Sequence, residues 1–402
     1  MNNNFLQIAM VLGLLSAIGP FAIDMYLPAL PSIGSSLGAS AGAVQMSLMA
    51  FFIALGLGQM VYGPASDMFG RKRPLYWGLA IFAVGSVGCA LAADIQTLVL
   101  WRLVQGTGAC AGMVVPRAVV RDLHTGSEAA RLMALLTLVF SVSPILAPLF
   151  GSFLIEWSGW RAVFWAVTVA AVLAMVLLAM ALPETRSKES RIGSTVGSAL
   201  RGYGVLLRDG HFIGLVLIGG FGISSFFAYL ANSSFVLIDH YGLTPREYSF
   251  AFAANAASFI GMSQLTGRMV KRFGMVPLVR WGVVFYAAVM TLLLVLHWAG
   301  FEGLPLIIAL LFIGYGFLGL VMPSAAVLAL DEHGEIAGTA SALMGTLQFM
   351  TGAAVMALVG LFVDGTARPM LVGIAGSALV TLLLTAITLR GHRADKPHQP
   401  IA

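Results

Sequence analysis

Asp24 and Arg102 are the two charged residues that stand well inside apolar stretches of this sequence. A charge near the centre of a bilayer costs about 2.5–3.5 kcal/mol on insertion scales, so charges kept there usually serve a site. Asp24 comes near the end of the first apolar stretch, and Arg102 follows soon after the start of the fourth. If these stretches cross a membrane in opposite directions, the side chains lie at matched depth, where an ion pair or a shared aqueous cavity is possible. The alternative is that Asp24 is merely interfacial and that Arg102 extends its head group to the membrane surface.

No histidine competes with Asp24 as an embedded proton carrier. All seven fall in predicted loops, at the ends of apolar stretches or in the tail: His124, His211, His240, His297, His333, His392 and His398. If transport is coupled to protons, Asp24 is therefore the carrier by elimination. Cys89 and Cys110 lie in different apolar stretches without metal-ligand spacing, so we expect neither a disulfide nor a metal site.

A second group of charges follows the second apolar stretch. The run from Gly63 through Asp67, Gly70 and Arg71 to Arg73 predicts a tight turn in which the glycines supply unusual dihedral angles and close approach. Asp67 is then placed to accept hydrogen bonds from a neighbouring helix N-terminus, where negative charge is favoured. The plainer interpretation is a cytoplasmic anchor of positive charge.

The same pattern returns 204 residues later. Gly267 matches Gly63, and Phe273-Gly274 matches Phe69-Gly70, at the end of the eighth apolar stretch. Parallel repeats of six helices are typical of transporters. The chemistry is not repeated, because Lys271 replaces the acid at this turn, and Ala228 and Leu306 stand at the positions equivalent to Asp24 and Arg102.

Two further features suggest moving parts and a cavity. Pro144, Pro148 and Gly151 predict a bend in the fifth stretch, because proline removes a backbone donor and small residues permit close packing. A gating role for this bend is a further hypothesis, which composition alone leaves open. Most polar side chains inside membrane helices only join helices. The residues that we select as candidates to line a cavity are Tyr26, Gln45, Gln105, Phe226, Tyr229, Asn232, Asn255 and Gln348.

The composition requires membrane-spanning helices to position these residues. The 402 residues are 59% hydrophobic and 10% charged, whereas a soluble domain has about 25% charged residues. Continuous apolar runs of the length that a helix needs to span a bilayer disfavour a transmembrane β-barrel, whose strands alternate apolar and polar residues. Twelve spans are predicted, at 5–28, 43–62, 75–93, 97–119, 131–155, 161–182, 212–238, 247–267, 277–298, 303–330, 337–362 and 368–390.

The longest polar stretch divides the spans into six and six. We predict one six-helix bundle over residues 1–182, a cytoplasmic linker over 183–211, a second bundle over 212–390 and a cytoplasmic tail over 391–402. The first span lacks a basic leader, so we expect it to be retained. With Arg102 inside a span and Arg161, Arg246 and Arg368 on the outer side, the other 18 of the 22 Lys and Arg residues lie at or near the inner face. The positive-inside rule then places both termini in the cytoplasm, and the basic residues are explained without nucleic acid.

Several motifs resemble those of a known family. The run Gly63–Arg73 resembles motif A of the major facilitator superfamily, and Leu98–Gly108 resembles its motif B. The run from Ala22 to Pro31 looks like the first-span motif of twelve-helix drug/proton antiporters. With Arg117–Asp122, it is similar to the Bcr/CflA subfamily of bicyclomycin and chloramphenicol exporters. The Leu182–Thr185 run is also typical of such proteins.

The resemblance implies an all-α membrane protein with two pseudo-symmetric six-helix bundles around a cavity. It implies a multidrug efflux antiporter of the bacterial inner membrane that works by alternating access and needs no cofactor beyond the proton motive force. Asp24 would then be the proton and substrate site, Arg102 would modulate its protonation, and Asp67 and Arg71 would latch the bundles together at the cytoplasmic side. The expected partners are a small drug, protons and lipid, and the expected state is a monomer. The fifth span departs from the antiporter motif, because Ala147–Gly151 keeps only the proline and the last glycine.

Other functions remain open at this point. A metabolite exporter for sugars or amino acids would use the same scaffold, since fold does not settle substrate. A membrane enzyme is disfavoured because the sequence has no metal cluster or nucleophile motif. A structural membrane protein would have little use for an embedded Asp and Arg, and the lack of a Walker A sequence excludes ATP-driven transport by this chain alone.

Overall fold

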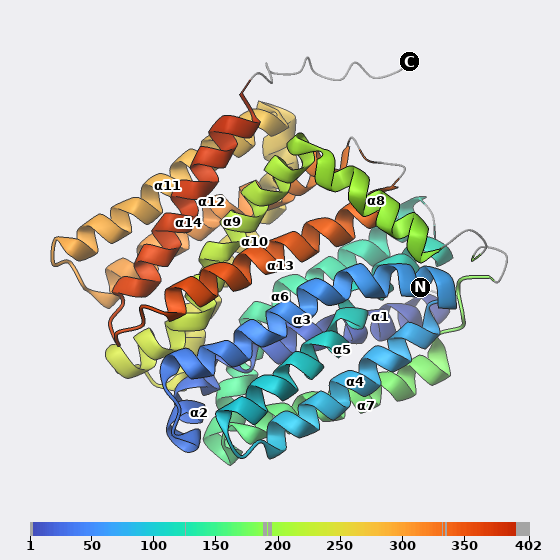
Figure 1. Ribbon diagram of the computed structural model, residues 1–402, viewed down its shortest axis with the longest axis horizontal. Helices are drawn as coiled ribbons and strands as arrows, with labels where there is room; N and C mark the ends of the chain where they lie inside the picture. The colour runs from blue at the N-terminus through green and yellow to red at the C-terminus, as the bar shows by residue number, and fades with distance from the viewer. Residues whose placement is uncertain are drawn as a thin grey trace.

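The computed structural model describes residues 3–124, 126–187, 191, 195–331, 333 and 336–390. This part of the chain forms helices and short connections, and contains no strand (Figure 1). The architecture is therefore the all-α membrane fold that the composition predicts. The predicted tail, 391–402, lies outside the described residues.

The first half of the chain forms one group of packed helices. α3 and α4 pack against α5, α4 also packs against α7, and α1 packs against α6. The elements are α1 Asn3–Asp24, η1 Leu27–Ala29, α2 Leu30–Leu37, α3 Ala41–Phe69, α4 Lys72–Leu91, α5 Ile95–Leu123, α6 Gly126–Ser158 and α7 Arg161–Ala181.

The second half forms a corresponding group, preceded by a helix inside the predicted linker. In it α10 packs against α12, α9 against α14, and α11 against both α12 and α14. The elements are α8 Val196–Arg208, α9 Gly210–Ser234, the π-helix η3 Phe235–His240, α10 Pro245–Phe273, α11 Met275–Trp298, α12 Leu304–Asp331, α13 Ala337–Gly360 and α14 Arg368–Thr388.

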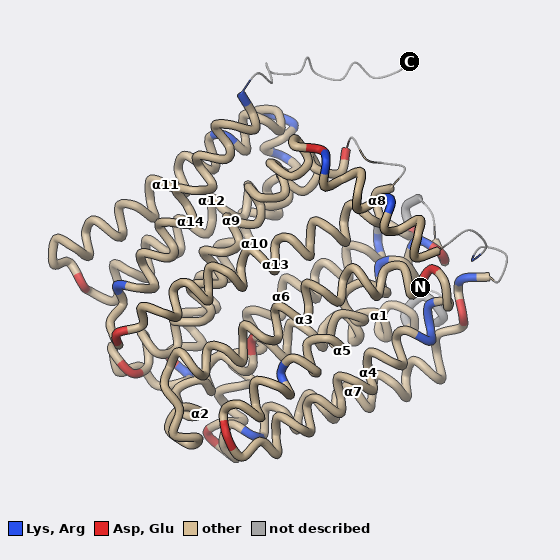
Figure 2. The backbone as a smooth tube through the Cα atoms, viewed as in Figure 1, with Lys and Arg blue, Asp and Glu red and all other residues tan. Residues whose placement is uncertain are grey.

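The two halves meet along two seams, α3 against α13 and α6 against α10 (Figure 1). We name the end of the molecule that carries Arg71 and α8 the linker end, and the end that carries Ser40 and Asp239 the far end. Most basic positions lie at the linker end, whereas acidic positions lie at both ends (Figure 2). The bundle bounds 1–182 and 212–390 stay a prediction.

All but one of the predicted spans are long and apolar enough to cross a membrane. Eleven helical segments of the described chain are long and apolar enough to cross a membrane. The predicted span that is missing from these eleven is the eighth, 247–267, which corresponds to α10; this helix is 29 residues long but carries Glu247 in its first turn and Lys271 and Arg272 in its last. It packs between α6 and α12, where Ser249, Asn255 and Ser258 are buried, whereas Glu247, Lys271 and Arg272 at its ends are exposed.

The first span is broken, which the sequence analysis did not predict. α1 ends at Asp24, and a turn and the short η1 lead into α2. Pro28 and Pro31 lack backbone donors, so they cannot make the α-helical hydrogen bonds to Asp24 O and Leu27 O, and the helix does not continue through this segment.

Candidate functional site

The break in α1 leaves a backbone carbonyl for Arg102. Tyr26 N donates to Ile23 O at 3.3 Å rather than to Ala22 O. Arg102 Nη1 donates to this Ala22 O at 3.3 Å. A cation is favourable at a helix C-terminus, where the carbonyl ends of the peptide dipoles point. Arg102 therefore caps α1 two residues before Asp24.

Arg102 is fully buried and is held by neutral groups. Its Nη1 also donates to Gln105 Oε1 at 2.6 Å, and Gln105 Nε2 donates to Ser86 Oγ at 2.8 Å. The guanidinium carbon lies 4.4 Å from the ring centre of Tyr26 and 4.2 Å from that of Phe51. Two aromatic faces can stabilise a desolvated cation. Gln105 and Tyr26, predicted to line a cavity, thus hold Arg102 in this conformation.

Asp24 is nearly buried, with 5% of its surface exposed, and it makes no ion pair with a described residue. The direct Asp24–Arg102 pair that was considered from the sequence is therefore not formed here. Ser143 of α6 lies beside the carboxylate, and Tyr248 of α10 is within electrostatic range. The hydroxyls of Tyr248 and Ser233 lie 3.1 Å apart in the second half. Asp24 thus lies at the break in α1, with α6 of the first half and α10 of the second half nearby.

The other cavity candidates mostly join helices in this conformation. Gln45 Nε2 donates to Asn232 Oδ1 at 2.9 Å, and Asn255 Nδ2 donates to the Tyr229 hydroxyl at 3.1 Å. The ring centres of Phe226 and Tyr229 lie 6.2 Å apart, within a cluster of aromatic rings in the second half. Gln348 packs closely on the backbone of α9, because a Cβ on Gly219 would lie 2.7 Å from its Nε2.

Three aromatic rings that the sequence analysis missed close the seam between α3, α9 and α13. The rings of Phe52 and Phe227 are stacked with centres 4.5 Å apart, and Phe349 lies 5.6 Å from both. Thr346 Oγ1 adds a hydrogen bond to Gly56 O at 2.7 Å on the same seam. No local sequence pattern distinguishes these rings from ordinary apolar residues.

The bend in α6 lies at the other seam. Ser249 Oγ of α10 donates to Pro148 O of α6 at 2.9 Å. A Cβ on Gly151 would overlap Met25 O, so only glycine lets α6 approach the break in α1 this closely. Pro144 also lies inside α6. The proline-rich segment therefore contacts both the broken helix and the other half.

Arg71 is the centre of a charged network at the linker end. Its Nη1 donates to Asp67 Oδ1 at 2.7 Å, its Nε to Asp122 Oδ2 at 2.7 Å, and its backbone amide to Glu184 Oε1 at 2.8 Å. Burial alone would lower the pKa of the Arg71 guanidinium, but hydrogen bonds and charges of Asp122 and Asp67 outweigh burial, and the pKa is raised. The Arg186 guanidinium lies 3.3 Å from Asp67 Oδ1.

This network belongs to the first half and the linker. The bonds found for Asp67 and Arg71 in the described chain do not reach the second half, so the predicted latch between the bundles is not formed here. Gly70 has a φ of +87°, as Gly274 has +82° in the repeat, so the turn itself recurs. Gly63 lies inside α3, and a Cβ there would meet no atom within 4 Å, so the turn is shorter than the sequence indicated. Asp122 and Glu184 stand in the motifs of the sequence resemblance but were not selected as site residues.

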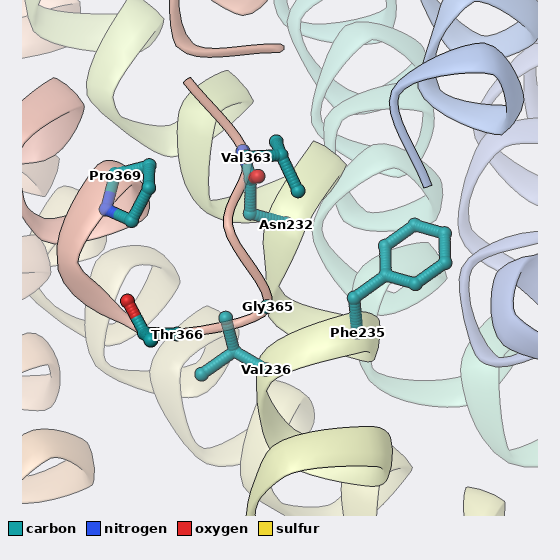
Figure 3. Close-up of a pocket in the computed structure, with 7 residues that line it drawn as sticks. All are labelled: Asn232, Phe235, Val236, Val363, Gly365, Thr366 and Pro369. Atoms are coloured by element: carbon teal, nitrogen blue, oxygen red, sulfur yellow. The ribbon is translucent and has the colours of Figure 1, made fainter. Parts of the chain in front are cut away.

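A pocket opens at the far end, between η3 and the connection from α13 to α14. Asn232, Phe235, Val363, Thr366 and Pro369 line its inner part (Figure 3). In the part of the chain that the structure describes, no group of three or more His, Cys, Asp or Glu side chains is placed to hold a metal ion.

Comparisons with known proteins agree with this architecture. The family model described as Major Facilitator Superfamily matches residues 12–357. An uncharacterized MFS-type transporter of Bacillus subtilis, YdgK, is 37% identical over 370 residues, which cover 91% of each chain. A bicyclomycin resistance protein homolog of Haemophilus influenzae is 29% identical over 379 residues, covering 93% of this chain and 94% of the relative. The xylose transporter XylE from E. coli superposes with a TM-score of 0.74 at 15% identity, covering 99% of this chain and all of XylE, and shows the shared fold.

Proposed function

The chain belongs to the Major Facilitator Superfamily, and we propose that it is a proton-coupled multidrug efflux antiporter for small antibiotics of the bicyclomycin or chloramphenicol type. Its family and its relatives are those of a multi-pass membrane transporter rather than an enzyme. The relatives include a bicyclomycin resistance protein homolog and a chloramphenicol resistance protein of Pseudomonas aeruginosa. These relatives support the class of drug that we propose as the substrate, and the proposed proton coupling is argued from Asp24 and its surroundings.

The observation that carries the proposal is the nearly buried carboxylate of Asp24 at the break in α1. A buried carboxylate without a paired cation is costly, so it is stabilised by a proton or by the charged or polar group of a substrate. Arg102 is fixed on Ala22 O and on two rings, and it adds positive potential at the same break without occupying the carboxylate. One group can thus hold a proton or a drug, but not both.

Exchange follows when this group faces the two sides in turn. With the far end open, protons enter and neutralise Asp24, which weakens its hold on a cationic or polar drug. With the linker end open, the proton leaves and the drug binds. Coupling results because the two ligands compete for one carboxylate.

The contacts between the halves suit such a cycle. The bonds Gln45–Asn232 and Ser249–Pro148 hold the far end together. Asp67 and Arg71 act as the latch that reaches the second half only when the linker end closes. Pro148 and Gly151 let α6 shift against the break in α1.

The remaining assignments complete the proposal. The protein lies in the bacterial inner membrane as a monomer, with the linker end and both termini in the cytoplasm, as the excess of basic residues at that end supports. Its partners are the drug, protons and lipid. It needs no cofactor, because the proton gradient drives transport.

Substrate-induced proton release from detergent-solubilised protein tests the proposal. Chloramphenicol or bicyclomycin added in weak buffer should release protons from the parent protein, and Asp24→Asn should abolish the release. Asp94→Asn, at an exposed acid outside the spans, is the matched control and should release protons as the parent does. If Asp24→Asn also releases them, another group carries the proton. Release by sugars or amino acids, and not by either antibiotic, would instead identify a metabolite exporter.

A further inference from the structure

Helix α8 carries an apolar strip that the rest of the described chain leaves uncovered. Val196, Leu200 and Leu207 are each more than half exposed, and their spacings of four and seven residues place them on one side of the helix. The strip borders the buried side of α8, which contains Tyr203 and Leu206. A helix with a packed side and an adjoining exposed apolar strip is suited to the membrane interface, where the strip leaves water.

The packed side of α8 lies across the seam between the two halves. The Tyr203 hydroxyl donates to Met60 O of α3 at 3.3 Å. Gly202 packs on α13, since a Cβ on this glycine would lie 3.0 Å from the methyl group of Thr339. α8 crosses the ends of the long helices at a steep angle (Figure 1). Because the long helices cross the membrane, a helix laid across their ends runs along the membrane surface.

The same helix presents positive charge to its surroundings. Arg201 and Arg208 lie seven residues apart on the exposed side of α8, next to the apolar strip, and α8 contains no acid. Neither arginine makes an ion pair with a described residue. The adjacent acid, Asp209, accepts from two backbone amides at the start of α9 and lies 3.1 Å from the His333 ring. The charge of α8 therefore complements a surface that combines acyl chains with anionic head groups.

We propose that α8 is a binding surface for anionic phospholipids. The apolar strip of Val196, Leu200 and Leu207 lies at the level where the acyl chains begin, and Arg201 and Arg208 extend to the phosphate groups, as long cationic side chains do. Lipid bound in this way holds α8 on the seam between α3 and α13. This role is separate from the proposed antiport, because it requires neither a drug nor a titrating carboxylate.

A fluorophore on Leu200→Cys whose emission depends on polarity measures the binding. Cys89 and Cys110 are buried, so the label attaches to residue 200 of the purified protein. Phosphatidylglycerol titrated into dodecyl maltoside micelles should shift the emission to the blue, and zwitterionic phosphatidylcholine should need more than ten times as much lipid. Raising the salt concentration should move the phosphatidylglycerol midpoint upward, because salt screens exposed charges. The same label on Ser198→Cys, on the opposite flank of α8, should shift little.

Substitution of the arginines tests the charge. Arg201→Gln and Arg208→Gln should each raise the phosphatidylglycerol midpoint about fivefold, the contribution expected of one basic residue at an anionic surface. Arg201→Lys keeps the charge and should retain most of the affinity. Arg246→Gln, at an exposed arginine of the far end, is the matched control and should leave the midpoint unchanged. Phosphatidylglycerol should also raise the unfolding temperature of the parent more than that of the variant that lacks both arginines.

Three outcomes overturn the proposal. Equal midpoints for the two lipids, or unchanged midpoints in both arginine variants, would show that α8 does not select anionic lipid. An emission shift that follows protein concentration rather than lipid would place a second copy of the chain on the apolar strip instead. None of these measurements involves export or proton release, so failure here leaves the proposed antiport standing, and failure of the antiport leaves this surface standing.

Discussion

Gln45 and Asn232, 187 residues apart in sequence, form a side-chain hydrogen bond of 2.9 Å that joins α3 to α9 near the far end. Gln45 is 4% exposed and Asn232 3%, so water does not readily replace either partner. Such a bond contributes about 0.5–1.5 kcal/mol net. It therefore biases the molecule toward a closed far end without preventing opening.

Gln45→Leu should open the far end more often. Removing a bond of this strength predicts about a two- to tenfold rise in the open population. The reporter is Ser249→Cys, a buried position against Pro148 of the other half, whose labelling by an impermeant maleimide should rise by the same factor. Gln96→Leu, at an exposed glutamine of α5, is the control. An unchanged labelling rate in Gln45→Leu would show that the bond does not hold the halves together.

Asp122→Asn should damage the protein more than Asp67→Asn. The Asp122 side chain is 17% exposed and binds Arg71 through both oxygens, whereas that of Asp67 is 45% exposed. Weakening a hydrogen-bonded partner of a buried charge costs about 1–3 kcal/mol. Thermal unfolding in detergent should show the loss, with Glu128→Gln, 68% exposed at the same end, unchanged.

The same pair of variants tests the latch. Asp67→Asn should impair export while leaving unfolding close to that of the parent. Normal export by Asp67→Asn would reduce this network to an anchor that sets membrane orientation.

The long elements were predictable because membrane thickness fixes their length and apolarity. α5 at 95–123 contains the predicted span 97–119, and the second repeat reproduces the positive φ of Gly70 at Gly274. The break at Asp24 was not predicted, although Pro28 and Pro31 were visible, because an apolar run says nothing about which backbone donors pair. The amphipathic α8 was hidden within a stretch identified only as polar linker.

The contacts of the site were less predictable than its members. Asp24 and Arg102 do meet the same helix break, but Arg102 binds the carbonyl of Ala22, whose availability depends on the break itself. Phe52, Phe227 and Phe349 come from three helices and both halves, so their stacking follows only from tertiary packing. Sequence shows which charges are embedded, and packing decides their partners.

Asp94 should make the stability of α5 depend on pH in the acid range. Hydrogen bonds from the backbone and side chain of Thr97 lower the pKa of Asp94, which caps the helix outside the spans. Because the folded pKa lies below the unfolded one of about 3.9, this contribution is present above pH about 4 and is lost as the pH falls through the folded value. Asp94→Asn keeps a good capping residue and should lose less stability than the parent on acidification. Thermal unfolding in detergent at pH 5 and pH 3 measures this difference, and an equal loss of stability in the parent and in Asp94→Asn would contradict the prediction.

Orientation can be read from two surface positions. Ser35 lies in α2 at the far end and Arg201 in α8, and both are exposed. In intact cells an impermeant maleimide should label Ser35→Cys and leave Arg201→Cys unlabelled until the membrane is opened. The reverse pattern would invert the proposed direction of transport.

Gly151→Ala and Gly261→Ala separate a glycine that packing requires from one that it does not. A Cβ on Gly151 would overlap Met25 O at the break in α1, so α6 or the break must move, at about 1–3 kcal/mol for an overpacked site. Gly261 lies inside α10 with no atom within 4 Å of an added Cβ, and alanine there should stabilise the helix by about 0.5–1 kcal/mol. Unfolding temperatures in detergent should therefore shift in opposite directions. Export should fall only in Gly151→Ala, because the segment of α6 that must move carries both Pro148 and Ser143, which lies beside Asp24. If Gly151→Ala unfolds and transports as the parent does, α6 does not depend on this close approach.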